Sequence, residues 1–237
     1  MIPRMDSEPE NRKPRGAFYG RRKGHPLRKG QAHLMQDVLP QLALNLAQPA
    51  PADLRVLFSP RVSSVRVEIG FGGGENLLFE ARENPGIGHI GCDVYVNGVA
   101  KCVAMLAEEK LTNVRVHHGD AQPLLEWLPE ASLDRLDILY PDPWPKRRHW
   151  KRRFISDERV KKIARAVKPG GMVRFATDIP HYAEWALVRF GRSGRFQWTA
   201  ERARDWLEPW AGFPGTRYEA KAMREGRKPA YFSFLRS

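Results

Sequence analysis

Residues 65–75 of the chain read VRVEIGFGGGE, and this stretch decides the fold. Its first five residues have the composition of a buried strand, and they run directly into glycines. The following segment, ENLLFEARE (75–83), has helical character. Glycines at such a junction let the helix begin close to the strand and let the backbone approach a ligand. The stretch therefore predicts the first strand and helix of an α/β sheet with a ligand site at its edge.

The alternation of strand and helix continues outward from this stretch. Strands are predicted at 87–93, 114–118, 136–140 and 172–178, and helices at 96–110, 154–171 and about 180–190. Two late strands are predicted at 195–200 and 231–235, and a helix at 31–47 that Pro40 is expected to break or kink. This order predicts a doubly wound, mostly parallel sheet, which binds ligands beyond the carboxyl ends of its strands.

The charge of the chain is unevenly distributed. The 237 residues carry 40 Lys and Arg against 27 Asp and Glu, a net charge of +13. Residues 1–30 have a net charge of +6 and residues 146–168 of +9, whereas residues 31–145 have a net charge of −7. Two basic runs on an acidic body favour a polyanionic partner, either nucleic acid or an anionic membrane surface. Residues 1–30 lack apolar periodicity, so we expect a disordered basic arm followed by a single domain at 31–237.

Other features of the sequence favour a cytoplasmic protein. No apolar run approaches the ~18 residues that a membrane span needs. The N-terminus has no apolar core of a secretory signal, and its acidic residues argue against a transit peptide. Cys92 and Cys102 are too few for a disulfide framework and suit a reducing compartment. No metal site is predicted, because His117 and His118 point to opposite faces of a strand.

The glycine loop favours a cationic ligand over a dinucleotide. Gly70, Gly72 and Gly74 provide the turn, but the third position of the dinucleotide fingerprint, counted from Gly70 and Gly72, is occupied by Glu75. Glu68 adds a second carboxylate that would repel a pyrophosphate. S-adenosylmethionine carries an ammonium and a sulfonium and no phosphate, so it suits this loop. A purely structural glycine turn is the alternative.

Carboxylates also follow the second and third strands. Asp93 comes 19 residues after Gly74, where a carboxylate can accept both hydroxyls of a ribose. Asp120 follows the third strand, where it can accept from the exocyclic amine of adenine. Because Asp is favoured at helix N-caps, a structural role is the alternative for both residues.

The segment after the fourth strand, PDPWPKRRHWKRR (141–153), is the strongest functional signal. Three prolines in five residues fix the backbone around Asp142, and Trp144 offers a flat surface for a base. Six basic residues in eight follow, with His149 and Trp150 between them, which suits phosphates and stacked bases. Later in the chain, the polar cluster at 216–221 would by itself be interpreted as surface.

Together these segments resemble the bacterial tRNA (guanine-N7-)-methyltransferases, from about residue 30 to 235. The most specific match is PDPWPKRRHWKRR, and EIGFGGG, GDA, ATD and TRYEAK occur in the order of the family. The resemblance implies a Rossmann-like class I methyltransferase fold, with a seven-stranded, mostly parallel sheet, helices on both faces and an antiparallel last strand. It also implies methyl transfer from S-adenosylmethionine to N7 of guanine at position 46 in the tRNA variable loop.

Matched motif by motif, the resemblance implies roles for individual residues. The cofactor-binding residues would be Glu68, Gly70, Gly72, Gly74, Asp93, Asp120 and Asp142, and Asp142 would also be catalytic. The substrate-binding residues would be Lys146, Asp178, Thr216, Arg217, Tyr218 and Glu219. The RNA-contacting residues would be Arg148, His149, Trp150, Lys151, Arg152 and Arg153. Many family members carry Glu in place of Asp93, so the ribose contact is expected to be longer or bridged by water.

The implied reaction requires little acid–base chemistry. N7 of guanine carries a lone pair and no proton, so catalysis is expected to rest on positioning and on carboxylate stabilisation of the cationic product. Asp142 suits both tasks, whereas Lys146 would hold RNA. The expected partner is tRNA, the expected state a monomer or homodimer, and no membrane association is expected.

Two alternatives belong to other functional classes. An exocyclic-amine methyltransferase acting on RNA or DNA usually has a Pro-Pro-aromatic tetrapeptide after the fourth strand, where this chain has Asp-Pro-Trp. A non-catalytic RNA-binding protein would keep the basic runs but would not need acidic residues after successive strands.

Overall fold

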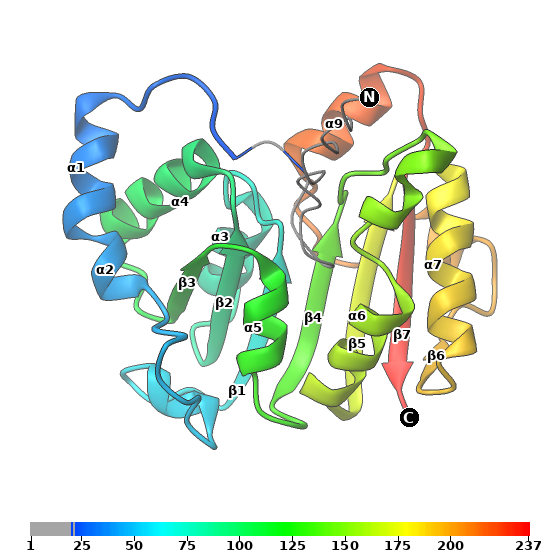
Figure 1. The fold of residues 1–237 in the computed structure, drawn as a ribbon, viewed down its shortest axis with the longest axis horizontal. Coiled ribbons are helices and arrows are strands. Elements are labelled where there is room, and N and C mark those ends of the chain that lie inside the picture. The colour runs from blue at the N-terminus through cyan, green and yellow to red at the C-terminus, as the bar shows by residue number, and fades with distance from the viewer. Residues whose placement is uncertain (1–19, 21) are drawn as a thin grey trace, which may run out of the picture.

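The predicted strands form one seven-stranded sheet within residues 20 and 22–237, the part of the chain that the computed structural model describes (Figure 1). The strand order is β3-β2-β1-β4-β5-β7-β6. The strands are β1 (Ser64–Ile69), β2 (Ile87–Asp93), β3 (Val114–His118), β4 (Leu133–Leu139), β5 (Val167–Thr177), β6 (Phe196–Trp198) and β7 (Ala230–Arg236). Strands β1 to β5 are parallel, and β7 runs antiparallel to both β5 and β6, as the resemblance implied.

The central strand β1 is fixed in register by both of its parallel neighbours. Val67 pairs with Ile90 of β2 on one side and with Leu136 of β4 on the other. All three side chains are almost fully buried. The order of the sheet reverses between β1 and β4, so the chain leaves these two strands in opposite directions across the sheet. Such a switch point opens a crevice at the carboxyl ends of the strands.

Helices cover both faces of the sheet, as predicted. One layer contains α1 (Lys29–Asp37), α2 (Leu39–Leu42), α3 (Glu75–Glu83) and α4 (Val96–Glu109). The other layer contains α5 (Ala121–Trp127), α6 (Asp157–Ala166) and α7 (Pro180–Arg192). Each layer has its own apolar cluster, with Leu78 and Val103 in the first and Leu124 and Phe190 in the second. Two short 3₁₀ helices, η1 (Leu54–Leu57) and η2 (Arg147–Arg152), and the late helices α8 (Arg204–Leu207) and α9 (Arg217–Arg224) complete the described elements.

Two predicted helices differ from those observed. The helix expected at 154–171 is shorter, since Ser156 caps α6 by accepting a hydrogen bond from the Arg159 amide, and strand β5 already begins at Val167. The helix expected at 31–47 is divided into α1 and α2, because Pro40 lies in the first turn of a second helix. The helices α5 and α9 were not predicted.

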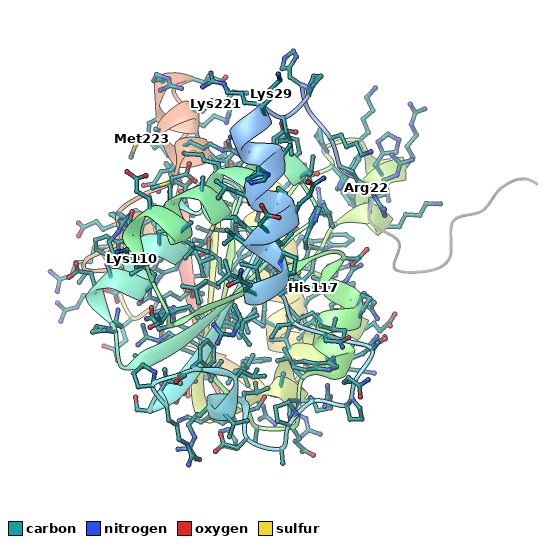
Figure 2. The ribbon with its side chains drawn as sticks, turned by 90° about the vertical axis from the view of Figure 1, so that its left-hand side faces the viewer. Arg22, Lys29, Lys110, His117, Lys221 and Met223 are labelled. Atoms are coloured by element: carbon teal, nitrogen blue, oxygen red, sulfur yellow. The ribbon has the colours of Figure 1, made fainter. Side chains whose placement is uncertain are left out.

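The residues before α1 contact the start of α4. The amide of Gly24 donates to Oδ1 of Asn97 at 2.7 Å, and Nδ2 of Asn97 donates to the carbonyl of His25 at 2.7 Å. The amide of Val96 donates to the carbonyl of Arg22, whose side chain Figure 2 shows to the right of α1. The rest of the predicted basic arm, residues 1–19 and 21, lies outside the described residues.

Candidate active site

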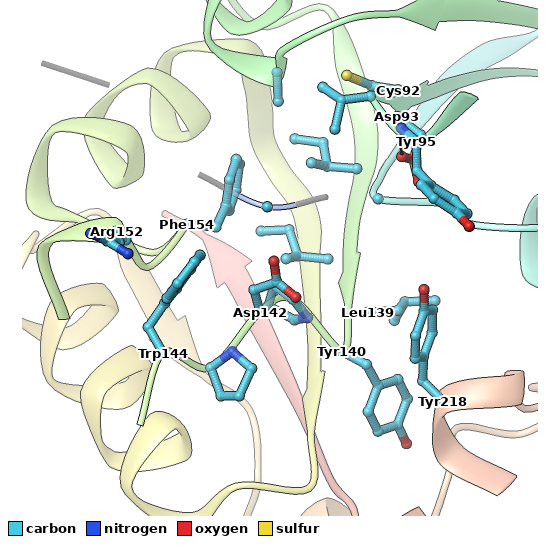
Figure 3. Close-up of a pocket in the computed structure, with 18 of the residues that line it drawn as sticks. Cys92, Asp93, Tyr95, Leu139, Tyr140, Asp142, Trp144, Arg152, Phe154 and Tyr218 are labelled. Carbon is cyan, nitrogen blue, oxygen red and sulfur yellow. Dashed lines mark hydrogen bonds between the residues drawn. The ribbon is translucent and has the colours of Figure 1, made fainter. Parts of the chain in front are cut away.

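A cavity of about 590 Å³ opens at the carboxyl edge of the sheet, where the topology predicts a ligand site (Figure 3). Its wall includes residues that follow each of the first five strands. Among the predicted site residues, those that line it are Gly70, Asp93, Asp120, Asp142, Arg152, Asp178, Arg217 and Tyr218. The fold therefore brings together side chains that are more than 140 residues apart in the sequence.

The glycine loop begins at the cavity, where Gly70 lines the wall, whereas Gly72 and Gly74 lie outside it. Gly70, Gly72 and Gly74 all have positive φ angles, of +80°, +57° and +87°, which a side chain would strain. Gly74 also precedes α3, and a Cβ there would lie only 2.8 Å from the sulfur of Cys102 on α4. The glycine thus allows α3 and α4 to pack closely behind the loop, with the Cys102 side chain fully buried between them.

Asp93 holds this loop and faces the cavity at the same time. Its Oδ2 accepts a hydrogen bond from the Gly72 amide and its Oδ1 one from the Tyr95 amide, both at 2.7 Å. Burial raises the pKa of Asp93, while these two hydrogen bonds act in the opposite direction. Each carboxylate oxygen can accept a second hydrogen bond, so the structural role and a ribose-binding role are compatible.

Asp120 has the structural role considered for it and also lines the cavity. Its Oδ1 accepts from the Gln122 amide at 2.9 Å, which makes it the N-cap of α5. The side chain nevertheless lines the cavity, next to Gly119 and Ala121. Because the cap occupies one oxygen, the other can accept a hydrogen bond from a ligand.

Glu68 lies behind the glycine loop and not in the cavity wall. Only 4% of the residue is exposed, and Oε2 accepts a hydrogen bond from Nδ2 of Asn76 on α3 at 2.8 Å. Burial raises the pKa of Glu68 to about 8, so the side chain is mainly protonated at neutral pH. This placement differs from the expectation that Glu68 contributes negative charge to a ligand site.

The backbone around Asp142 is constrained on both sides. Tyr140 and Trp144, which flank Pro141–Pro143, have φ angles of +51° and +43°, a region that bulky residues rarely adopt. The Asp142 side chain points into the cavity in Figure 3. No group in the described residues donates a hydrogen bond to it, and withdrawal from water raises its pKa. The carboxylate is therefore held ready for hydrogen bonds from outside the chain.

Sequence comparison identifies the family. Residues 63–231 match the protein family described as "Putative methyltransferase". The chain is 55% identical to a tRNA (guanine-N(7)-)-methyltransferase of Rhodopseudomonas palustris (strain BisA53), over 94% of this chain and 89% of that protein. It is 52% identical to one of Rhizobium meliloti (strain 1021), over 93% of this chain and 95% of that protein. The chain belongs to the tRNA (guanine-N7)-methyltransferase family.

Solved structures agree on the fold of this methyltransferase. The 16S rRNA methyltransferase KamB matches with a TM-score of 0.57 over 80% of this chain and 96% of that one, at 18% identity. An antibiotic-related methyltransferase matches with a TM-score of 0.53 over 79% of this chain and 94% of that one, also at 18% identity. At these identities the likeness concerns the Rossmann-like sheet and its helices.

The helix α9 brings the TRYEAK segment of the methyltransferase to the rim of the cavity. Thr216 is its N-cap, with Oγ1 accepting from the Glu219 amide at 3.1 Å. Glu219 is buried and accepts from the hydroxyl of Tyr231 at 2.6 Å, so it anchors the helix and does not line the cavity. Arg217 and Tyr218 do line it, with the guanidinium stacked on the phenol ring. The spacing of a hydroxyl residue three positions before Glu is a helix-start signal that could have predicted α9.

Asp178 lines the cavity beside α9 and forms an ion pair with Arg227, a residue that the sequence analysis did not single out. The pair joins the end of β5 to the segment after α9. It was not predictable from spacing, because 49 residues separate the two partners.

The basic segment of the methyltransferase has an exposed side and a buried side. Lys146, Arg148 and Lys151 are exposed at η2, outside the cavity wall. His149 lies among them, and desolvation together with the neighbouring cations lowers its pKa. Trp150 instead packs against His181 and Trp185 of α7.

Arg153 corrects one sequence prediction. Only 1% of the residue is exposed, so it does not present its guanidinium at the surface as an RNA-contacting residue would. Sequence alone could not separate it from the exposed cations earlier in the same segment.

Within the described residues, no group of three or more metal-ligating side chains is present. No helix in the same part of the chain is long and apolar enough to cross a membrane.

Proposed function

We propose that this methyltransferase transfers a methyl group from S-adenosylmethionine to N7 of a guanine in tRNA, at position 46 of the variable loop. The observation that carries the proposal is Asp142, a carboxylate without an internal hydrogen-bond donor among the described residues, fixed at the tip of β4. The names of relatives at 52–55% identity support the reaction and the class of substrate.

The cavity fits a methyl donor of this kind. Its volume of about 590 Å³ suits a nucleoside-sized ligand. Asp93 would bind the ribose and Asp120 the adenine amine, while the Gly70 backbone would lie along the amino-acid part of the ligand. When bound, S-adenosylmethionine supplies a methyl group activated on a sulfonium. The carboxylates of the wall suit its positive charges, and Glu75 remains outside the cavity wall, in an ion pair with Lys101.

Asp142 would orient the guanine and stabilise its positive charge. A carboxylate can accept hydrogen bonds from the guanine N1–H and the exocyclic amino group, which both become more acidic as N7 is alkylated. The contact therefore strengthens as charge develops, which is the condition for catalysis by electrostatic stabilisation. No residue needs to remove a proton from N7, so Asp142 would act through its charge and its hydrogen bonds and not as a general base.

Exposed cations around the mouth would bind the RNA backbone. On one side lie Lys146, Arg148 and Lys151 of the η2 region. On the other side lie Arg217 and Lys221 of α9, and Figure 2 shows Lys221 projecting from the surface at the same end of the molecule as Lys29. These cations surround an acidic cavity, which separates phosphate binding from the site that holds the donor.

The direct test is to incubate the protein with labelled S-adenosylmethionine and tRNA transcripts, and to map the label by chain cleavage at 7-methylguanosine. Transcripts with G46 replaced by adenine are the control. Label at N7 of G46 would support the proposal, and label on an exocyclic amine would overturn it. Localisation in the cytoplasm is part of the same proposal, since two free, buried cysteines suit a reducing compartment.

A further inference from the structure

Arg153 occupies an aromatic box inside the methyltransferase. Its guanidinium carbon lies 4.8 Å from the ring centre of Trp150, 5.0 Å from that of Tyr182 and 4.7 Å from that of Trp185. Tyr182 and Trp185 belong to α7, whereas Trp150 belongs to the basic segment η2. Three aromatic rings from two elements therefore lie around this one guanidinium.

The hydrogen bonds of Arg153 lead from this box to the segment that carries Asp142. Its Nε donates to the carbonyl oxygen of Pro143 at 2.8 Å. Its Nη2 donates to Nδ1 of His181 at 2.8 Å, and since a guanidinium has only donors, this imidazole nitrogen must accept. Pro143 directly follows Asp142 and directly precedes Trp144, whose backbone is in the left-handed region.

A buried cation of this kind is costly to the fold. Among the residues that the structure describes, no carboxylate lies within ion-pair distance of Arg153, and its Nη1 is buried without a partner. Burial accordingly lowers its pKa. An apolar side chain would fill the same space without this penalty. What an apolar residue could not do is donate to the Pro143 carbonyl while packing against Trp150 and Trp185.

We propose that Arg153 is a positioning residue, which fixes the Pro143 carbonyl and so holds the Asp142 carboxylate toward the guanine. The inference rests on the proposed function. It assigns Arg153 a different task from its exposed neighbours, because those would bind phosphate while Arg153 connects their segment to Asp142. Because the same guanidinium contacts Trp150 of the basic segment and Pro143 beside Asp142, the two segments would move together.

The test compares Arg153→Lys and Arg153→Met in the full-length protein, with kcat and the KM for tRNA measured separately. We expect both variants to lower kcat about 10- to 100-fold, because a lysine cannot donate to Pro143 and His181 from a stacked plane. We expect the KM for tRNA, the affinity for S-adenosylmethionine and the salt dependence of tRNA binding to stay close to wild type. A purely structural role would lower donor affinity and thermal stability together with kcat.

The RNA-contact hypothesis predicts the opposite pattern. Under it, Arg153→Lys keeps full activity, and Arg153→Met flattens the log–log salt dependence of tRNA binding by roughly 0.7–0.9. Lys151→Met provides the reference for such a change, because Lys151 is exposed in the same segment. Arg192→Met, exposed in the last turn of α7 away from the cavity edge, is the control for loss of a surface cation.

Variants of His181 decide the question if both Arg153 variants fail to fold. His181→Leu removes the second acceptor but leaves Arg153 and its charge, so kcat should fall about 3- to 10-fold, while His181→Gln, which restores an acceptor, should recover most of it. Wild-type kcat in Arg153→Lys or His181→Leu would overturn the proposal. If the wild-type protein forms no 7-methylguanosine, the proposed function fails, which is a separate result.

Discussion

The two sides of the cavity hold their carboxylates in different ways. On the side where we propose that the methyl donor binds (the donor side, residues 70–120), Asp93 and Asp120 accept three backbone N–H groups between them and so help to form their own loops. On the side where we propose that the guanine binds (the base side, residues 140–153), Asp142 accepts none from the described residues and is held by prolines and by two left-handed residues. The difference indicates that the donor side is preformed by its own hydrogen bonds. On the base side, the Asp142 carboxylate keeps its hydrogen-bonding capacity free, as the proposed contact with guanine requires.

The largest expected effect comes from removing the negative charge of Asp142, which tests whether the two sides of the cavity have separate tasks. Asp142→Asn keeps the shape of the side chain but removes its negative charge, so kcat should fall about 10²- to 10³-fold. Isothermal titration should find the affinity for S-adenosylmethionine within a few-fold of wild type. If donor affinity is lost instead while kcat at saturation is kept, Asp142 belongs to the donor side and the comparison fails.

The matching change on the donor side should affect binding and folding together. Asp93→Ala leaves the Gly72 and Tyr95 amides without their acceptor, so we expect donor affinity to fall about 30- to 100-fold, with a measurable loss of thermal stability. Asp93→Glu is the control, because the longer carboxylate can still reach both amides and the ribose. A normal Tm in Asp93→Ala would show that the loop does not depend on this residue.

A substitution at Glu68 tests whether the negative charge on the donor side comes only from Asp93 and Asp120. Its pKa is raised to about 8 in the folded protein, above the ordinary value of 4.5, so its contribution to stability is complete below pH 4.5 and is lost as the pH rises toward 8. Glu68→Gln should therefore become more stable than wild type as the pH increases. Between pH 5 and pH 7, the free energy of unfolding of Glu68→Gln relative to wild type should increase by about 2 kcal/mol.

Denaturant unfolding of both proteins at several pH values measures this gain. An equal difference in free energy of unfolding at pH 5 and pH 8 would mean that Glu68 is ionised in the folded state. The donor side would then carry a third negative charge.

The smallest expected effect concerns the exposed cations of the base side. Replacing Arg148 and Lys151 together by Ala should flatten the log–log salt dependence of tRNA binding by roughly 0.7–0.9 for each lost phosphate contact. The kcat at saturating tRNA should hardly change, since neither side chain lines the cavity. Filter binding at several salt concentrations measures the slope, and an unchanged slope would remove this segment from the RNA interface.

The sequence predicted the sheet and the cavity edge well because both follow from local patterns. Strands with buried, β-branched residues and the positive-φ glycines at 70–74 are recognisable without a structure. The end of the helix predicted at 154–171 was wrong, because residues 167–171, which include Pro169, Gly170 and Gly171, lie within β5. A strand that begins directly after a helix leaves little local signal to separate the two.

Roles that depend on burial could not be predicted from the sequence. Glu68, Arg153 and Glu219 have polar or charged side chains beside functional motifs, but the fold turns all three away from the cavity wall. Their partners, Asn76, Pro143 and Tyr231, are 8 to 12 residues away, and no spacing rule links them. Asp120 shows a different outcome, because the side chain that caps α5 also lines the cavity, so the structural and ligand-binding roles considered as alternatives are compatible.

The packing of Cys102 against Gly74 gives the protein an internal reporter of opening. Cys102 is fully buried, and burial strongly raises the pKa of its thiol, so a thiolate does not form at neutral pH while α3 and α4 remain packed. An alkylating reagent can react only after these helices separate, which makes the modification rate proportional to the population of open molecules. Mass spectrometry of the peptide that contains Cys102 would therefore measure how often the donor side opens. The same measurement with ligand present would show how far binding suppresses that opening.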